Sequence, residues 1–165
     1  MTQRAHQLDA IDAKLLALLQ ADAQQSSRSL AETLAISASS VQRRIRTLRG
    51  AGIIERVSAI VRAQRVGQGL TVLVSVWLKS EDVRAVQQFK RQMVATPQVT
   101  HCYHVTGDHT FVLILCLPNM DAFAPFAERV FDSNASVLKF NTSVAIATVK
   151  SGGAVPVAPD DRQTR

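Results

Sequence analysis

Residues 26–52, SSRSLAETLAISASSVQRRIRTLRGAG, have the pattern of two short helices joined by a tight turn. Apolar residues recur at helical spacing in both helices, so each helix has one side that can face a core. The second helix also carries an arginine cluster opposite its apolar stripe. A helix of this kind packs into a small domain while presenting cations outward, as reading DNA in the major groove requires. The inward-facing residues are Leu30 and Leu34 in the first helix and Val41, Ile45 and Leu48 in the second.

Another helix is expected before this pair, at about residues 9–22, with Asp9 as its N-cap. Ser26 and Ser37 are expected to cap the two following helices, and Gly50 and Gly52 to end the third. The alternating apolar and polar residues 53–67 then predict a two-stranded wing. We therefore predict a winged helix-turn-helix domain over residues 1–62 and a linker over 63–70. The apolar stripe of the first helix comprises Ile11, Leu15, Leu16, Leu18 and Leu19.

The second half of the chain changes to strand patterns. A β-branched run at 71–78 predicts a strand, and helical spacing follows over 80–94 until Pro97. Strands at 99–106 and 110–117 flank a short turn, and a second helix and a last strand at 137–149 follow. The order β-α-β-β-α-β predicts an α+β fold, a ferredoxin-like sheet over residues 71–150 with both helices on one face. We expect a short strand at 154–157 in an otherwise flexible tail, 151–165.

A sheet covered by helices on one face leaves its other face bare. Such a face is usually buried against a partner, so we expect this domain to form a homodimer through its sheets. A dimer would place two identical readers on a two-fold DNA site, with half-sites about one helical turn apart or a multiple of that.

The charge of the chain is concentrated in its first half. The net charge is +6, and residues 1–66 hold ten Lys and Arg against five Asp and Glu. This balance favours a polyanionic partner. Cys102 and Cys116, without a secretory signal, indicate a reducing cytoplasm and no disulfide framework. No stretch is long and apolar enough to predict a membrane span.

The candidate DNA-reading residues lie on and just before the third helix. Arg43 points away from the core and is the candidate for a bidentate contact to guanine, and Gln42 can reach adenine. Arg44, Arg46 and Arg49 are expected to grip phosphates. The hydroxyl groups of Ser37, Ser39 and Ser40 are expected to donate to phosphate at the helix N-terminus.

These residues resemble the Lrp/AsnC family of bacterial and archaeal transcription factors. In the first half the resemblance is carried by LDAIDAKLLALLQADA (8–23), SLAETLAIS (29–37) and VQRRIRTLRGAGII (41–54). In the second half it is carried by YHVTGDHTFVLIL (103–115) and TSVAIATVK (142–150). The resemblance implies a DNA-binding transcriptional regulator that binds double-stranded DNA, forms dimers or octamers, and responds to an amino acid or related small molecule.

The resemblance also implies an effector site. Gly107 and Asp108 match the Gly-Asp turn of the family, and Thr142 and Ser143 match its late loop. The turn can offer backbone N–H groups to a carboxylate, and Asp108 can face an ammonium group. Gly107 and Asp108 can equally be explained as an ordinary hairpin turn. Thr110 stands where the family usually has an acidic residue, which removes one partner for an α-ammonium group.

Residues of the second half also bear on other functions. His101, Cys102, His104 and His109 cluster in sequence, but strand alternation leaves only Cys102 and His104 on one face, too few for a zinc site. We expect no cofactor, no metal and no enzymatic activity. Two alternatives are a haem-pathway decarboxylase of similar two-domain architecture and an architectural protein that wraps DNA with little sequence preference.

Overall fold

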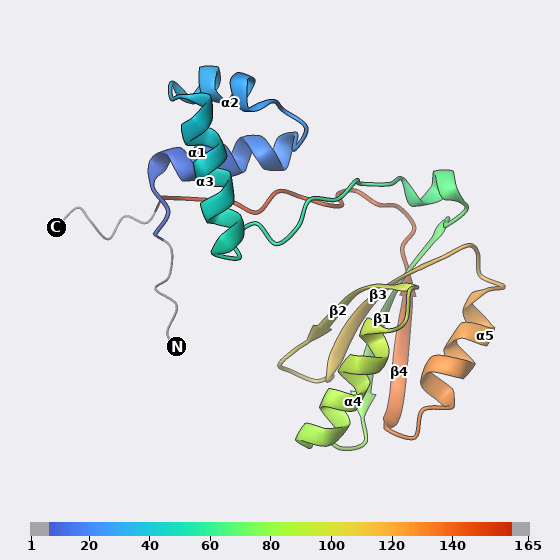
Figure 1. Cartoon of the computed structure of the whole chain (residues 1–165). Helices are drawn as coiled ribbons and strands as arrows, with labels where there is room; N and C mark the ends of the chain where they lie inside the picture. The colour runs from blue at the N-terminus through green and yellow to red at the C-terminus, as the bar shows by residue number, and fades with distance from the viewer. Residues whose placement is uncertain (1–6, 160–165) are drawn as a thin grey trace. The chain divides into compact units, whose positions relative to one another are not determined.

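The computed structural model describes residues 7–159 and divides them into two compact units (Figure 1). The first unit combines residues 7–60 with residues 150–159, and the second unit comprises residues 61–149. Along the chain, the second unit is therefore an insertion in the first. The two units are joined by two chain connections, at residues 60–61 and 149–150.

The first unit begins with three helices, α1 (Ala10–Ala21), α2 (Ser27–Leu34) and α3 (Ala38–Gly50). The N-caps predicted for these three helices are confirmed. The Asp9 carboxylate accepts from the backbone N–H of Asp12 at 2.7 Å, and the Ser26 and Ser37 hydroxyl groups accept from N–H groups in the first turns of α2 and α3. Each cap satisfies an N–H group that the helix itself leaves without a partner.

The core of the first unit draws on all three helices. Leu15, Leu30, Val41 and Leu48 are almost fully buried, and Ile45 packs half-buried against them. Burying a Leu or Val side chain stabilises a fold by about 1.5–3 kcal/mol relative to leaving it exposed. These contacts therefore fix α3 on α1 and α2, as the periodicity predicted.

A polar contact supplements this apolar packing between α1 and α3. Nη1 of Arg44 lies 2.7 Å from the Asp9 carboxylate and 2.7 Å from the Asp12 carboxylate. Asp12 is only 3% exposed. A carboxylate buried to this extent is stabilised by a charged partner. Burial favours a raised pKa for Asp9, but the hydrogen bond from Asp12 and the charge of Arg44 together hold that pKa below its usual range.

The predicted two-stranded wing at residues 53–67 is wrong for the described chain. Residues 55–62 run extended outside any sheet, and a short 3₁₀ turn, η1 (Ala63–Val66), follows. The segment between Ile54 and Val66 contains no Gly, Asn, Asp or Pro to form a hairpin turn, so the chain does not fold back on itself. The alternating pattern reflects a strand-like conformation without a strand partner.

The second unit contains the predicted β-α-β-β-α-β order. Its strands form one antiparallel sheet in the order β2-β3-β1-β4, with β1 and β3 in the centre (Figure 1). The helix α5 passes directly into a π-helical turn, η2 (Glu128–Asp132). The elements are β1 (Leu70–Leu78), α4 (Val83–Val94), β2 (Val99–His104), β3 (Phe111–Leu117), α5 (Phe123–Ala127) and β4 (Val137–Val144).

Both helices cover the same face of this sheet, as predicted. A single buried cluster joins Val74 of β1 and Leu113 of β3 to Phe89 of α4 and Phe131 of η2. No helix of the part of the chain that the structure describes covers the opposite face. Leu73 on that face is 41% exposed and Tyr103 is 52% exposed.

We predict that Arg44→Met destabilises the first unit by about 1–3 kcal/mol, because it removes the Arg44 guanidinium group from the buried Asp12 carboxylate and from Asp9. Urea unfolding followed by far-UV circular dichroism should show an earlier loss of helix. The fluorescence of Trp77, the one tryptophan of the chain, reports the second unit and should keep its midpoint.

Arg28→Met is the matched control, since Arg28 is exposed and, among residues 7–159, forms an ion pair only with Glu32 on its own helix. The pKa of Asp9 is held below its usual range in the folded state. The ionised Asp9 carboxylate therefore stabilises the fold above its unfolded pKa, and this stabilisation is lost as pH falls through the lower, folded pKa. The difference between Arg44→Met and wild type should therefore shrink below roughly pH 4. A difference that is unchanged in acid would contradict the role assigned to the ion pairs.

Candidate functional site

The exposed surface of α3 carries cations and no acidic side chain. Arg43, Arg46 and Arg49 are all exposed, and so is Gln42. The buried residues Val41 and Leu48 occupy the other side of the same helix. The fold therefore presents three guanidinium groups and one carboxamide on a rigidly packed helix.

Three serine hydroxyl groups gather at the N-terminus of α3. Oγ of Ser37 lies 3.0 Å from Oγ of Ser39 and 2.8 Å from Oγ of Ser40. Ser37 also accepts from the backbone N–H of Ser40 at 3.2 Å. The three predicted residues are thus brought together where a helix N-terminus favours an anion.

Arg44 has a different place from the one expected. Its guanidinium group is turned toward α1 and paired with Asp9 and Asp12, and its side chain is only 22% exposed. The prediction that Arg44 grips a phosphate is corrected accordingly, because both carboxylates would have to be released first. No local signal in the sequence marks this pairing, since its partners lie 35 and 32 residues away.

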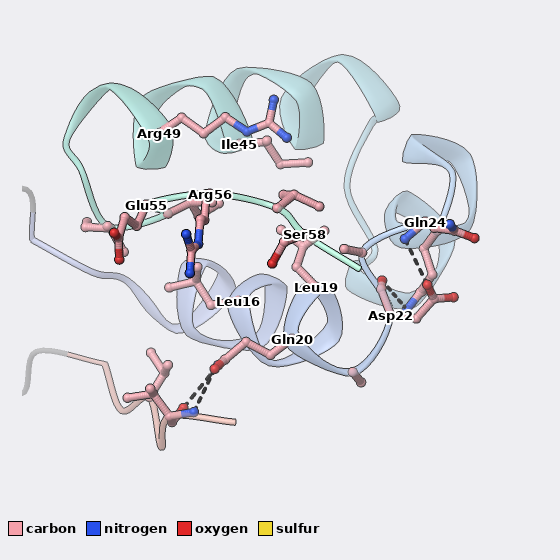
Figure 2. A pocket seen from close by; sticks show the side chains of 18 of the residues that line it. Leu16, Leu19, Gln20, Asp22, Gln24, Ile45, Arg49, Glu55, Arg56 and Ser58 are labelled. Atoms are coloured by element: carbon pink, nitrogen blue, oxygen red, sulfur yellow. Dashed lines mark hydrogen bonds between the residues drawn. The ribbon is translucent and has the colours of Figure 1, made fainter. Parts of the chain in front are cut away.

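An open groove runs alongside α3 within the first unit. Figure 2 shows Ile45 and Arg49 of α3 above it, Leu16 and Leu19 of α1 below it, and the extended chain with Glu55 and Arg56 between them. Gln42 and Arg46 also line this groove, which has a volume of about 1450 Å³. Arg43 does not line it. The exposed side chains of α3 therefore form two rows. Gln42, Arg46 and Arg49 lie beside the groove, and Arg43 lies further from it.

In the second unit, the predicted Gly107-Asp108 turn lies between β2 and β3. Gly107 has a φ of 123°, in the region that favours glycine, and a Cβ there would meet open space. The backbone N–H groups of residues 106–109 donate to no other described residue. His109 packs edge-on against Trp77 with ring centroids 5.6 Å apart. The turn is thus anchored on the sheet while its donors stay available.

Thr110 is placed differently from the expectation. It is only 3% exposed, and its hydroxyl group accepts from the Leu78 N–H at 3.1 Å and donates to a carboxylate oxygen of Glu81 at 3.0 Å. Thr110 therefore cannot offer its hydroxyl group to a ligand and instead holds the exposed Glu81 beside it. Sequence reasoning missed Glu81, because it lies 29 residues from Thr110 and only the sheet brings the two together.

Thr142 and Ser143 lie on β4, on the other side of β1 from β3. Thr142 pairs with Val74 on the face covered by helices, and Ser143 pairs with Leu73 on the bare face. Thr110 lies on the β3 side of β1, where its backbone N–H donates to the carbonyl oxygen of Val76. Within one chain, the structure brings Gly107, Asp108, Thr110 and Glu81 to one end of the sheet but leaves Thr142 and Ser143 apart from them.

The histidine and cysteine cluster has the geometry that strand alternation predicted. Cys102 and His104 pair with residues on the helix-covered face, and His101 pairs on the bare face. Burial raises the pKa of the Cys102 thiol, which keeps it protonated. Among residues 7–159, no three His, Cys, Asp or Glu side chains are grouped to hold a metal ion, and no helix could cross a bilayer.

We predict that Thr110→Val destabilises the second unit by about 1–3 kcal/mol, because the buried Leu78 N–H loses its acceptor. Urea unfolding followed by Trp77 fluorescence should show the lower midpoint. Thr106→Val, at an exposed position of the same turn, is the control and should unfold as wild type does. Equal midpoints for the two variants would remove the structural role of the Thr110 hydroxyl group.

Comparisons with known proteins agree with this geometry. The AsnC-type helix-turn-helix domain matches residues 8–49, and the Lrp/AsnC ligand binding domain matches residues 71–155. The HTH-type transcriptional regulator y4tD of Sinorhizobium fredii is 35% identical over 153 residues, which cover 93% of this chain and 90% of that protein. The leucine-responsive regulatory protein of Rhizobium meliloti is 30% identical over 151 residues, with 92% and 97% covered.

A solved structure gives the same result. The crystal structure of a transcriptional regulator from Neisseria meningitidis in complex with L-Met has a TM-score of 0.84 and 27% identity, and covers 90% of this chain and 96% of that chain. Both halves of the present chain thus match in sequence and in fold. The chain belongs to the Lrp/AsnC family and is a DNA-binding transcriptional regulator whose second domain is the ligand-binding domain of that family.

Proposed function

We propose that α3 reads the major groove of double-stranded DNA and that Arg43 makes the base-specific contact. The observation that carries this proposal is the exposed surface of α3, which has no acidic residue over Ala38–Gly50 and carries three guanidinium groups that form no ion pair with any residue of 7–159. Gln42 is placed one residue away and can reach a neighbouring base. Bidentate pairs of these kinds discriminate between bases by about 1–3 kcal/mol each.

Phosphate contacts are assigned to the remaining groups. Arg46 and Arg49 lie in the row beside the groove, and the hydroxyl groups of Ser37, Ser39 and Ser40 lie at the positive end of the helix dipole. Such contacts position the helix on the duplex without reading sequence. Arg44 is left out of this set because its charge is used inside the domain.

We further propose that the regulator acts as a homodimer. The face of the sheet without helices leaves Leu73 and Tyr103 half-exposed, and the backbone of residues 55–61 makes no hydrogen bond to another described residue. Both surfaces are suited to a second copy of the chain, one by apolar contact and one by strand pairing. Two readers related by a two-fold axis would match a palindromic site.

If α3 binds DNA in this way, two single-residue variants should lose affinity in two distinguishable ways. Arg43→Ala should weaken binding to a duplex selected from a random pool more than binding to unrelated duplex. Arg49→Ala should weaken both about equally and lower the slope of log affinity against log salt by about one, since it removes one phosphate contact. Fluorescence anisotropy at several salt concentrations measures both effects.

Arg91→Ala, on α4 of the ligand-binding domain, is the matched control for loss of one positive charge. It should bind both duplexes as wild type does. Equal losses on the selected and the unrelated duplex for Arg43→Ala would remove Arg43 from the reading role.

For the second domain we infer a small amino acid as the effector. The relative from Neisseria meningitidis was crystallised with L-Met. In the present chain, the available N–H groups of residues 106–109 suit a carboxylate, and the carboxylates of Asp108 and Glu81 suit an ammonium group. We assign no catalytic role to these residues, and the two relatives compared above are named as a transcriptional regulator and a regulatory protein.

If Glu81 and Asp108 receive the ammonium group, Glu81→Gln and Asp108→Asn should each weaken binding of the responding amino acid about tenfold or more. Calorimetric titration with a panel of amino acids and their 2-oxo acids measures this, and the 2-oxo acids should bind no worse to the variants. Asp121→Asn, exposed and at the opposite end of β3, is the control. Unchanged amino-acid affinity in both variants would exclude this assignment.

A further inference from the structure

The C-terminal segment belongs to the DNA-reading unit, although the chain reaches it from the last strand of the ligand-binding domain. Residues 150–159 group with the three helices and not with the sheet. Within the unit, residues 155–158 line the groove beside α1. We call residues 150–159 the C-terminal strap.

The strap is held by one side chain of α1 through two hydrogen bonds. The backbone N–H of Val155 donates to Oε1 of Gln20 at 2.7 Å, and Nε2 of Gln20 donates to the Val155 carbonyl oxygen at 3.0 Å. Figure 2 shows these two contacts as dashed lines from Gln20 to the strap. The carboxamide thus pairs with the Val155 peptide as a neighbouring strand would.

An apolar contact adds to this pair. Val157 is half-buried and packs against the core cluster that contains Leu15 and Leu16 of α1, whereas Val155 is 69% exposed. Gln20 therefore holds the strap through the backbone of Val155, and the core holds it through the side chain of Val157. Pro156 restricts the free segment to extended conformations, which lowers the entropy lost on docking.

We propose that the docked strap limits the orientations of the DNA-reading unit and so sets how strictly the regulator reads the spacing of two half-sites. This inference rests on the DNA reading and the dimer proposed above. A domain joined to its neighbour by one linker explores more orientations than a domain joined by two. Two readers held in fewer orientations lose less entropy at a correctly spaced site and tolerate a wrong spacing poorly.

The strap also gives the ligand-binding domain a second covalent route to the reader. Residues 61–69 lead from the reader into β1, and residues 145–149 lead from the end of β4 to the strap. Thr142 and Ser143, which match the late loop of the effector site, lie on β4. A rearrangement of β4 on ligand binding would therefore act on the strap without passing through β1.

The docking itself is tested on the full chain by NMR hydrogen exchange at the Val155 amide. Gln20→Ala should speed this exchange about tenfold or more, because the amide loses its acceptor. Gln24→Ala is the matched control, since Gln24 lines the same groove but its side chain makes no hydrogen bond to residues 150–159. Exchange that is equally fast in wild type and Gln20→Ala would show that the strap is not docked.

The consequence for DNA is tested with the duplex that wild type selects from a random pool, and with derivatives carrying insertions of roughly 5 base pairs, half a helical turn, between the half-sites. Wild type should lose about tenfold or more in affinity on the insertion. Gln20→Ala and a chain ending at Gly153 should lose about threefold or less, while binding an isolated half-site as wild type does.

The outcomes distinguish a failure of the proposed DNA reading from a failure of the proposed role of the strap. If wild type shows no preference for the selected duplex, the proposed DNA reading fails, and the exchange of Val155 still decides whether the strap docks. If the half-site affinity is kept and the strap variants remain as sensitive to spacing as wild type, the strap proposal is overturned and the DNA reading stands.

Discussion

The fixed seating of α3 is the constraint on which the reading surface depends. Val41 and Leu48 bury one side of the helix, and Arg44 ties it to the two carboxylates of α1. The remaining arginines of α3 project from a helix that cannot roll, because rolling would expose the apolar side and pull Arg44 away from the buried Asp12 carboxylate. One arginine is thus used for structure so that the others can be presented for recognition.

In the ligand-binding domain, a buried hydroxyl group has a comparable organising role. Thr110 closes the end of the central strands through Leu78 and holds the Glu81 carboxylate at the end of the sheet from which the Gly107 turn extends. The residues at this end of the sheet can accept an ammonium group and donate to a carboxylate. Thr142 and Ser143 lie across β1, so a ligand that contacts both groups of residues would have to meet them in more than one copy of the chain.

The order of the units along the chain links these two surfaces. Because the ligand-binding domain is inserted between α3 and the strap, the reader is built from both ends of the described chain. Its C-terminal part is held by a small number of contacts, from Gln20 and from the core beneath Val157. Segments held by few contacts open at low free energy and are the ones from which regulated elements are drawn.

Local patterns were sufficient to predict the order of helices and strands along the chain, the caps Asp9, Ser26 and Ser37 of the first three helices and the exposed arginines of α3, because caps and periodicity depend on residues within a few positions of one another. They were not sufficient for contacts between distant segments. The pairing of Arg44 with Asp9 and Asp12, the hold of Thr110 on Glu81 and the docking of Val155 on Gln20 each join residues 29 to 135 positions apart. The alternation at residues 53–67 predicted a wing because it reports an extended backbone, but only the tertiary structure decides whether that backbone has a partner within the chain.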